Sequence, residues 1–341
     1  MSRRQEEPDH HLDGAADHDR AFAPRAEALA EHNGVTQCIT EVRPGAFQSR
    51  YLRGCVYVIF AGVILSLGVF CVRNATSSNA WQYIFWRALG FTSALVIVAT
   101  LREKRSPLRQ LASLNRMAWL ACFCMALSQV TFISSIKAAT FAEVFLICSL
   151  APMMAAALAW PLLKERIGWT TIVAIITGFA GVYVMTGGEF NAANIDGQLI
   201  AVVSMLGFAG YTLCTRGSRP EDLDATLIGV GVLTALAGFT AISLSGLPLI
   251  PSATDITIAF FHGALLLSAG LFLFGQGSRY VSAVTFTMLA QAEAVLAPVW
   301  GFLYFAETPT RATLLGGALI LSAVILQALA GGNAAKPVSQ G

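Results

Sequence analysis

Charged side chains are scarce in this sequence. Asp, Glu, Lys and Arg make up 12% of its 341 residues, about half of the share in a soluble globular domain. Apolar residues reach 55%, which makes a lipid bilayer the expected solvent. The net charge is only +2, and Lys and Arg stand singly between apolar stretches. Because no basic face could follow a phosphate backbone, we expect no nucleic-acid partner.

Several chemical motifs are also missing. Five of the seven cysteines lie in or beside apolar stretches and no Cys-x-x-Cys pair occurs, so neither a disulfide framework nor a zinc site is expected. The sequence has no phosphate-binding Gly-x-x-x-x-Gly-Lys-Ser/Thr loop, no His-Glu-x-x-His and no Gly-x-Ser-x-Gly. These absences argue against ATP as a direct energy source, against a bound cofactor and against an enzyme.

The N-terminal segment 1–48 is polar and lacks the apolar core of a signal peptide. It predicts a disordered cytoplasmic tail, not a cleaved leader. The tail holds four of the five histidines, and His10 and His11 are adjacent. Because flexible histidine-containing tails seldom form a preorganised site, we expect no metal site there.

The rest of the chain consists of long apolar windows. A helix needs about 20 residues to cross the hydrocarbon core, and backbone groups left unpaired cannot face lipid. Ten windows qualify, and they predict an all-α membrane protein with ten transmembrane helices. The predicted spans are 52–72, 81–101, 117–136, 140–163, 168–187, 196–215, 224–245, 255–277, 282–305 and 311–331.

Lys and Arg between these spans predict the orientation, because cytoplasmic segments carry an excess of them. With the N-terminus inside, fourteen such residues fall on the cytoplasmic side and only Arg73, Lys137 and Arg311 on the other. We therefore expect a multi-pass protein of the cell inner membrane with both termini cytoplasmic, ending in a short tail over residues 332–341.

The chain contains an internal repeat in which matched residues always have the same separation as Gly68 and Gly210. This separation, here called the repeat offset, needs no gap between the matched positions. It pairs conservatively Lys137 with Arg279 and Thr140 with Ser282, and it pairs identically Gly68 with Gly210, Phe132 with Phe274, Ala155 with Ala297, Glu165 with Glu307, Thr171 with Thr313 and Val182 with Val324. Each copy, 50–187 and 196–331, holds five spans, so the second enters the membrane upside down. Two inverted five-helix repeats are typical of alternating-access carriers, whose substrate binds where the halves meet.

These motifs carry a family resemblance. Residues 132–143 read Phe-Ile-Ser-Ser-Ile-Lys-Ala-Ala-Thr-Phe-Ala-Glu, and Leu-Leu-Lys-Glu-Arg follows at 162–166; a related pattern returns from Phe274 to Pro309. A glycine-bearing span follows Glu165 and another follows Glu307, with Gly178 and Gly181 in the first and Gly316 and Gly317 in the second. Over about residues 50–331 the sequence resembles the EamA family of the drug/metabolite transporter superfamily. The resemblance implies a ten-helix carrier that exports amino acids, amines or drug-like metabolites, although some members import vitamins or cofactors.

Ionisable groups inside spans are costly, so each is a candidate for function. Arg87 lies about a third of the way into the second span, beside Trp86. Its guanidinium could hold a substrate carboxylate bidentately, with Trp86 and Gln129 as further binding residues. It could equally be a structural Arg that pairs with helix-end carbonyls or with Glu143.

Glu293 is the leading candidate, near the middle of the ninth span and two residues after Gln291. It could bind a substrate ammonium or exchange a proton during transport, and the alternative is a protonated Glu that only joins helices. His262 is a second candidate for proton coupling, although a lone His on an apolar helix more often packs. Glu143 is a candidate substrate-binding residue, with N-terminal capping of its own helix slightly favoured.

Two prolines, Pro152 and Pro298, lie within corresponding spans of the two copies, where they predict hinges or static kinks. The main hypothesis is a secondary transporter of small organic metabolites. An importer of a riboflavin-like or S-adenosylmethionine-like molecule is the alternative within transport, and a non-transporting membrane scaffold is the alternative outside it. Gly229 and Gly231 would permit close helix contacts within a protomer or across a homodimer.

Overall fold

The computed structural model describes residues 44–103, 107–163, 168–185, 195–216, 218–219, 222–281, 283–306 and 308–334. Residues 51–341 form one compact unit, separate from residues 1–50. Most of both predicted tails lies outside the described residues, as do Glu165 and Glu307. A helix begins at Pro44, inside the range predicted for the N-terminal tail, and another helix extends to Ala334. A helix start at Pro44 is favoured because proline presets the backbone angle of the first turn.

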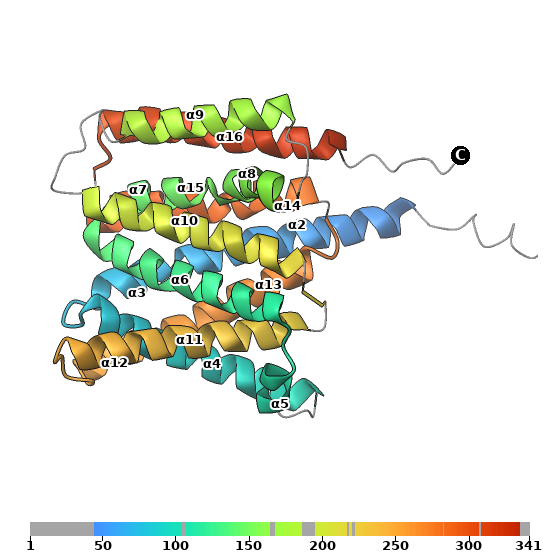
Figure 1. Ribbon diagram of the computed structural model, residues 1–341. Helices are drawn as coiled ribbons and strands as arrows, with labels where there is room; N and C mark the ends of the chain where they lie inside the picture. Colours follow the sequence, from blue (N-terminus) through green and yellow to red (C-terminus); the bar gives the residue numbers. More distant parts are fainter. Residues whose placement is uncertain are drawn as a thin grey trace, which may run out of the picture. The chain divides into compact units, whose positions relative to one another are not determined.

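Every regular element in the described part of the chain is a helix (Figure 1). The helices in chain order are α2 (Pro44–Ser66), α3 (Gly68–Asn74), α4 (Ala80–Glu103), α5 (Pro107–Ala112), α6 (Arg116–Ala138), α7 (Phe141–Cys148), α8 (Ala151–Leu163), α9 (Trp169–Met185), α10 (Ile195–Arg216), α11 (Leu223–Leu244), α12 (Ala253–Phe261), the π-helix η2 (His262–Leu267), α13 (Ser268–Gly277), α14 (Ala283–Ala290), α15 (Ala292–Phe305) and α16 (Arg311–Ala334). The prediction of an all-helical protein is confirmed.

Seven helical segments of the described chain are long and apolar enough to cross a membrane, and three shorter apolar helices accompany them. The shorter ones are Trp169–Val184, Ala292–Phe305 and Arg311–Gln327. Many large apolar side chains on these helices are exposed, among them Trp160 and Trp169. An apolar surface of this extent is unsuited to water and is expected where helices face lipid. The protein is therefore a multi-pass membrane protein.

Four of the predicted spans are not single helices. The span expected at 52–72 is divided into α2 and α3, and the span expected at 255–277 into α12, η2 and α13. The span expected at 140–163 is divided into α7 and α8, and the span expected at 282–305 into α14 and α15. In these last two spans the breaks fall at Ser149 and Gln291, which the repeat offset superimposes, and the same offset superimposes α7 on α14. Pro152 explains the first break in part, because it has no N–H to donate to the carbonyl of Cys148.

The prolines do not mark the break in both copies. Pro152 lies in the first turn of α8, whereas Pro298 lies well inside α15, about two turns after the second break. The break therefore recurs at the same aligned position although its distance from proline differs. We conclude that it belongs to the fold of each repeat and is not produced by proline alone.

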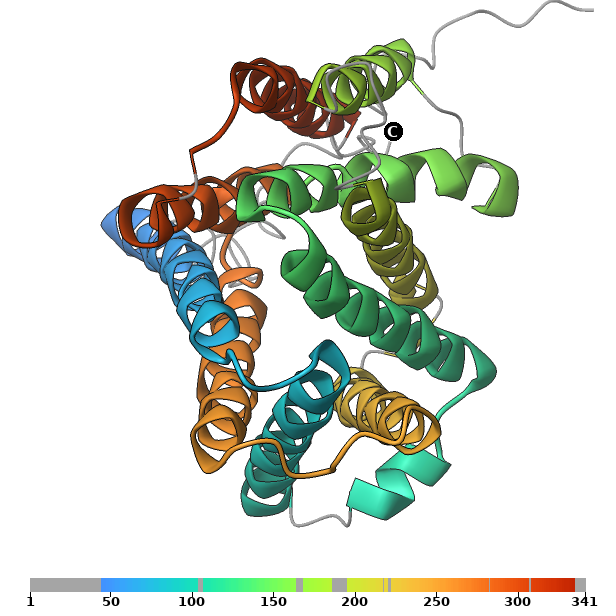
Figure 2. The same cartoon turned by 90° about the vertical axis from the view of Figure 1, so that its left-hand side faces the viewer.

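The helix pairs that pack together repeat the same relation. The repeat offset carries α4 onto α11 and α9 onto α16, and in each case the two equivalent helices pack against one another. α6 packs extensively along α10. Figure 2, the view turned by 90°, shows the helices of these pairs side by side. The largest buried cluster, which includes Phe141, Ile147 and Ile320, joins the broken helices to the α9–α16 pair.

α4 is held closely on two sides by glycines. A Cβ atom added at Gly231 or Gly238 of α11 would press on Thr92 or on the backbone of Phe85. On the other side, a Cβ atom at Gly263 would overlap the carbonyl oxygen of Arg87. Because glycine has no Cβ, α11 and η2 can approach α4 this closely. These contacts fix the helix that carries the buried arginine.

Candidate functional site

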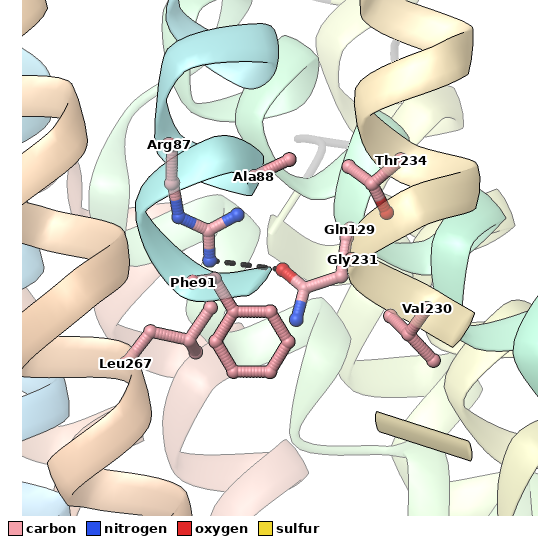
Figure 3. A pocket seen from close by; sticks show the side chains of 8 residues that line it. All are labelled: Arg87, Ala88, Phe91, Gln129, Val230, Gly231, Thr234 and Leu267. Atoms are coloured by element: carbon pink, nitrogen blue, oxygen red, sulfur yellow. Dashed lines mark hydrogen bonds between the residues drawn. The ribbon is translucent and has the colours of Figure 1, made fainter. Parts of the chain in front are cut away.

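Arg87 is buried at the centre of the helix packing, with 4% of its surface exposed. It comes from α4, and its Nη2 donates a hydrogen bond of 2.9 Å to Oε1 of Gln129 on α6. Figure 3 shows the two side chains pointing toward each other. Gln129 is itself 8% exposed. The two predicted site residues are therefore brought together, and Gln129 takes the place that the structural alternative gave to Glu143.

A small cavity lies beside this pair. Its volume available to the centre of a water molecule is about 10 Å³, which is room for roughly one water. Arg87, Ala88 and Phe91 of α4 and Gln129 of α6 form part of the wall; Val230, Gly231 and Thr234 of α11 and Leu267 of η2 complete it (Figure 3). In this conformation the cavity is far too small for an organic solute.

The polar groups of this cavity are incompletely paired. Nε of Arg87 and Oγ1 of Thr234 are buried and have no hydrogen-bond partner among the residues that the structure describes. Arg87 also lies more than 4.0 Å from every carboxylate oxygen of the described residues. A buried guanidinium whose only hydrogen bond goes to a neutral amide is energetically costly. Unpaired buried groups of this kind are explained by local strain, by a bound water or ion, or by a functional role.

Glu293 lies at the second helix break, in the first turn of α15, and Gln291 is the N-cap residue of that helix. The charge of Glu293 interacts electrostatically with that of Arg87 across the bundle. Both Gln291 and Glu293 are half-buried, and Glu293 accepts no hydrogen bond from the described part of the chain. Among the described residues, no hydrogen bond therefore joins this carboxylate to another helix.

Glu143 has a structural role in α7. Its Oε2 accepts the backbone N–H of Thr140 at 3.1 Å and completes a capping box with the Thr140 hydroxyl. Its Oε1 accepts a hydrogen bond of 3.0 Å from Gln198 of α10. Each oxygen of this buried carboxylate thus holds a partner, as the capping interpretation expects.

Trp86 is directed to a loop instead of the cavity. Its indole nitrogen donates a hydrogen bond of 3.0 Å to the carbonyl of Leu249, between α11 and α12. Trp86 is not among the residues that line the cavity. In this conformation it ties α4 to the loop, immediately before Arg87 in the sequence.

His262 begins the π-helix and is buried. Its Nδ1 lies 2.7 Å from the hydroxyl of Tyr83, and its Nε2 faces Gly68 of α3, where a side chain would collide with the ring. Sequence reasoning missed Tyr83, although its position one helical turn before Arg87 places both on one face of a helix. It also missed Thr234, for which the sequence offers no signal because threonine is common in helices.

A second polar network lies at one end of the bundle, around the loop that joins α3 to α4. Nζ of Lys137 donates hydrogen bonds of 3.1 Å and 2.8 Å to the carbonyls of Ala75 and Ser78. The backbone N–H of Ser78 donates a 2.6 Å hydrogen bond to Asp255 of α12, and the charges of Lys137 and Asp255 interact. These contacts, here called the loop clamp, join α6 and α12 across residues 75–78.

The described residues contain no group of three His, Cys, Asp or Glu side chains that could hold a metal ion. The histidines of the N-terminal tail lie outside that part of the chain. The six described cysteines are free thiols. Gly229 and Gly231 pack against Cys122 and Thr92 of the same chain, so both glycines serve contacts within the protomer.

Comparison with known proteins gives a consistent result. The pattern of the EamA-like transporter family matches twice, over residues 52–187 and 196–329. An uncharacterized transporter of Archaeoglobus fulgidus is 26% identical over 273 residues, which cover 79% of this chain and 94% of that protein. Uncharacterized transporter YwfM of Bacillus subtilis (strain 168) is 25% identical over 213 residues, 62% of this chain and 72% of that protein. A crystal structure with 16% identity has a TM-score of 0.57 and covers 85% of this chain and 99% of that chain, which is a likeness of fold.

Proposed function

Because the chain belongs to the EamA-like transporter family, we propose that it is a secondary carrier that exports small organic metabolites across the inner membrane by alternating access. Ten membrane helices in two inverted repeats form its framework, with both termini cytoplasmic. The observation that carries the proposal is Arg87, a buried cation whose guanidinium has one neutral partner and an unpaired Nε. A purely structural bundle gains little from keeping such a group.

The position of the site between the repeats supports this proposal. Arg87 and Gln129 come from the first matched region, and Thr234, Leu267 and Glu293 come from the second. A solute bound there would contact both halves, which is the arrangement that rocking of one repeat against the other requires. The second of the two equivalent helix breaks lies at Gln291, close to Glu293 in the sequence.

The roles that we assign follow from the geometry. Arg87 and Gln129 hold the anionic or hydrogen-bond-accepting part of the solute, and Glu293 holds an ammonium or carries a proton. Gln291, the N-cap residue of α15, lies at the same end of that helix as Glu293. Trp86 and Glu143 support the site through the loop and the α7 cap. His262, paired with Tyr83, is the second candidate for proton coupling.

The small cavity is consistent with a closed state in such a transport cycle. With room for roughly one water beside Arg87, the site is closed to solutes, so the surrounding helices must separate before one binds.

Flux into proteoliposomes tests the proposal. Radiolabelled amino acids, polyamines and drug-like amines are measured with wild type, Glu293→Gln and Arg87→Gln, and the exposed residue Asp224 supplies the matched control Asp224→Asn. We expect saturable flux that the two site variants abolish or uncouple from a pH gradient and that the control retains. Flux of riboflavin or S-adenosylmethionine would favour the importer alternative. No flux of any solute, in vesicles where the protein is folded, would favour the scaffold and refute the proposal.

A further inference from the structure

The groups left unpaired around the cavity share one chemical property: each of them can donate a hydrogen bond. Nε of Arg87 and the hydroxyl of Thr234 have no hydrogen-bond partner in the described part of the chain. The Nε2 amide of Gln129 donates to none of the described residues, since only its Oε1 is engaged, by Arg87. The rest of the wall is apolar and consists of Ala88, Phe91, Val230, Gly231 and Leu267.

Thr234 differs from its neighbours on the same helix. The hydroxyl of Thr226 donates to the carbonyl of Asp222 at 2.7 Å, and that of Thr240 donates to the carbonyl of Leu236 at 2.9 Å. This bond within the helix is the usual way for a helical threonine to satisfy its hydroxyl. Thr234 is 3% exposed, yet its hydroxyl makes no such bond. Figure 3 shows it on α11, across from Arg87 of α4.

Three hydrogen-bond donors that lack an acceptor favour a ligand that accepts hydrogen bonds. An ionised carboxylate only accepts hydrogen bonds and has about four lone-pair sites, so it can engage a guanidinium edge, an amide N–H and a hydroxyl at once. A cation would be repelled by Arg87. A purely donating group would leave Nε of Arg87 and the Gln129 amide unpaired, because of the three groups only the Thr234 hydroxyl can also accept. The apolar wall beside them suits the hydrocarbon part of the same molecule.

We propose that Arg87, Gln129 and Thr234 form a carboxylate subsite, in which Thr234 is a specificity-determining residue, and that the solute carries a carboxylate next to an apolar group. The inference rests on the proposed transport function and narrows its substrate class. Glu293 then takes the other end of a zwitterion, because it lies on the second repeat and interacts with Arg87 without pairing to it.

Binding to purified protein tests the subsite. The probes are apolar amino acids, each beside its methyl ester and its decarboxylated amine; for leucine these are L-leucine, L-leucine methyl ester and 3-methylbutylamine. Thermal stabilisation at matched ionic strength reports binding, because a ligand of the folded state raises the apparent melting temperature. We expect stabilisation by the acids and none by the esters or amines.

The variants separate a subsite from simple packing. Thr234→Val removes the hydroxyl and keeps the shape, so it should raise the Kd of the acid by about tenfold or more, since a hydrogen bond to a charged group is lost. Thr234→Ser keeps a hydroxyl and should bind the acid more tightly than Thr234→Val. Thr240 lies on the same helix and its hydroxyl is bonded within the helix, so Thr240→Val should leave the Kd unchanged.

Other outcomes overturn the inference in distinguishable ways. If esters and amines bind as well as the acids, or are transported in place of them, the protein is a carrier but the subsite is wrong. If Thr234→Val lowers the melting temperature and leaves the Kd of the acid unchanged, the hydroxyl serves only the packing or a structural water. If no probe binds and no solute moves in proteoliposomes, the proposed function fails together with its substrate class.

Discussion

The pairing of Arg87 with Gln129 allows one substitution pair with opposite expected effects. Gln129→Leu removes the acceptor of the 2.9 Å hydrogen bond and leaves a buried guanidinium with no hydrogen-bond partner among the described residues. Gln129→Glu places a carboxylate in nearly the same volume. We expect the first variant to be less stable than wild type, and the second to be at least as stable as wild type.

The magnitudes follow from burial. Loss of a hydrogen bond to a charged group costs about 1.5–3 kcal/mol. A new carboxylate about 4 Å from the guanidinium charge gains roughly 4 kcal/mol at an effective dielectric constant of 20, against a desolvation cost of several kcal/mol for the carboxylate itself. The desolvation of Arg87 adds nothing to that cost, because the wild type already buries it. The two variants should therefore differ by about 2 kcal/mol or more.

Thermal unfolding of detergent-purified protein measures this difference. The shift per kcal/mol falls with chain length and is about 1.4 °C for 341 residues, so the melting temperatures of the two variants should lie roughly 3 °C or more apart. Flux provides the second measurement, because Gln129→Glu occupies the guanidinium with a permanent anion and should abolish transport despite its stability. Equal melting temperatures for Gln129→Leu and wild type would refute the claim that Arg87 depends on this bond.

Three further outcomes are expected. Lys137→Met removes two donors of the loop clamp, so cysteine labelling at an introduced Ser78→Cys should become faster; an unchanged rate would show that the clamp does not hold the loop. Ala306, at φ 53° after α15, has the left-handed conformation that favours glycine, so Ala306→Gly should stabilise the protein by roughly 0.5–1 kcal/mol in thermal unfolding, and a loss of stability would contradict this. Glu143→Ala should lower stability by about 1–2 kcal/mol through the lost cap with no change in solute Kd, and a changed Kd would return Glu143 to the binding site.

Sequence reasoning found the membrane helices and the buried charges, because both are consequences of composition along the chain. A run of about 20 apolar residues has few alternatives to a membrane helix, and an Arg or Glu inside such a run is conspicuous. It also found the internal repeat, and the equivalent breaks at Ser149 and Gln291 follow the same offset. Reading each apolar window as a single helix was wrong for α2–α3, α7–α8, α12–η2–α13 and α14–α15, since hydropathy does not register an interruption of the helix.

The partners of those charges were beyond the sequence. Arg87 had helix-end carbonyls, Glu143 and a substrate as competing partners, and only the packing of α6 against α4 shows Gln129 beside it. Trp86 neighbours Arg87 in the chain, yet its indole reaches the Leu249 carbonyl because adjacent helical residues point in different directions. Thr234 lies in the other repeat, far from Arg87 along the chain, and nothing in its own segment distinguishes it from the other threonines of α11.

The sequence by itself thus determined the solvent, the apolar segments, the internal repeat and the family, since each depends on properties summed along a segment. Only the tertiary structure decided which polar groups meet at the interface of the repeats and which stay unpaired. The physical reason is that hydrogen bonding acts over about 3 Å between atoms, so it depends on how α4, α6 and α11 cross. The crossings of α4 with α11 and with η2 are set by close contacts at Gly231, Gly238 and Gly263, which hydropathy along the chain does not reveal.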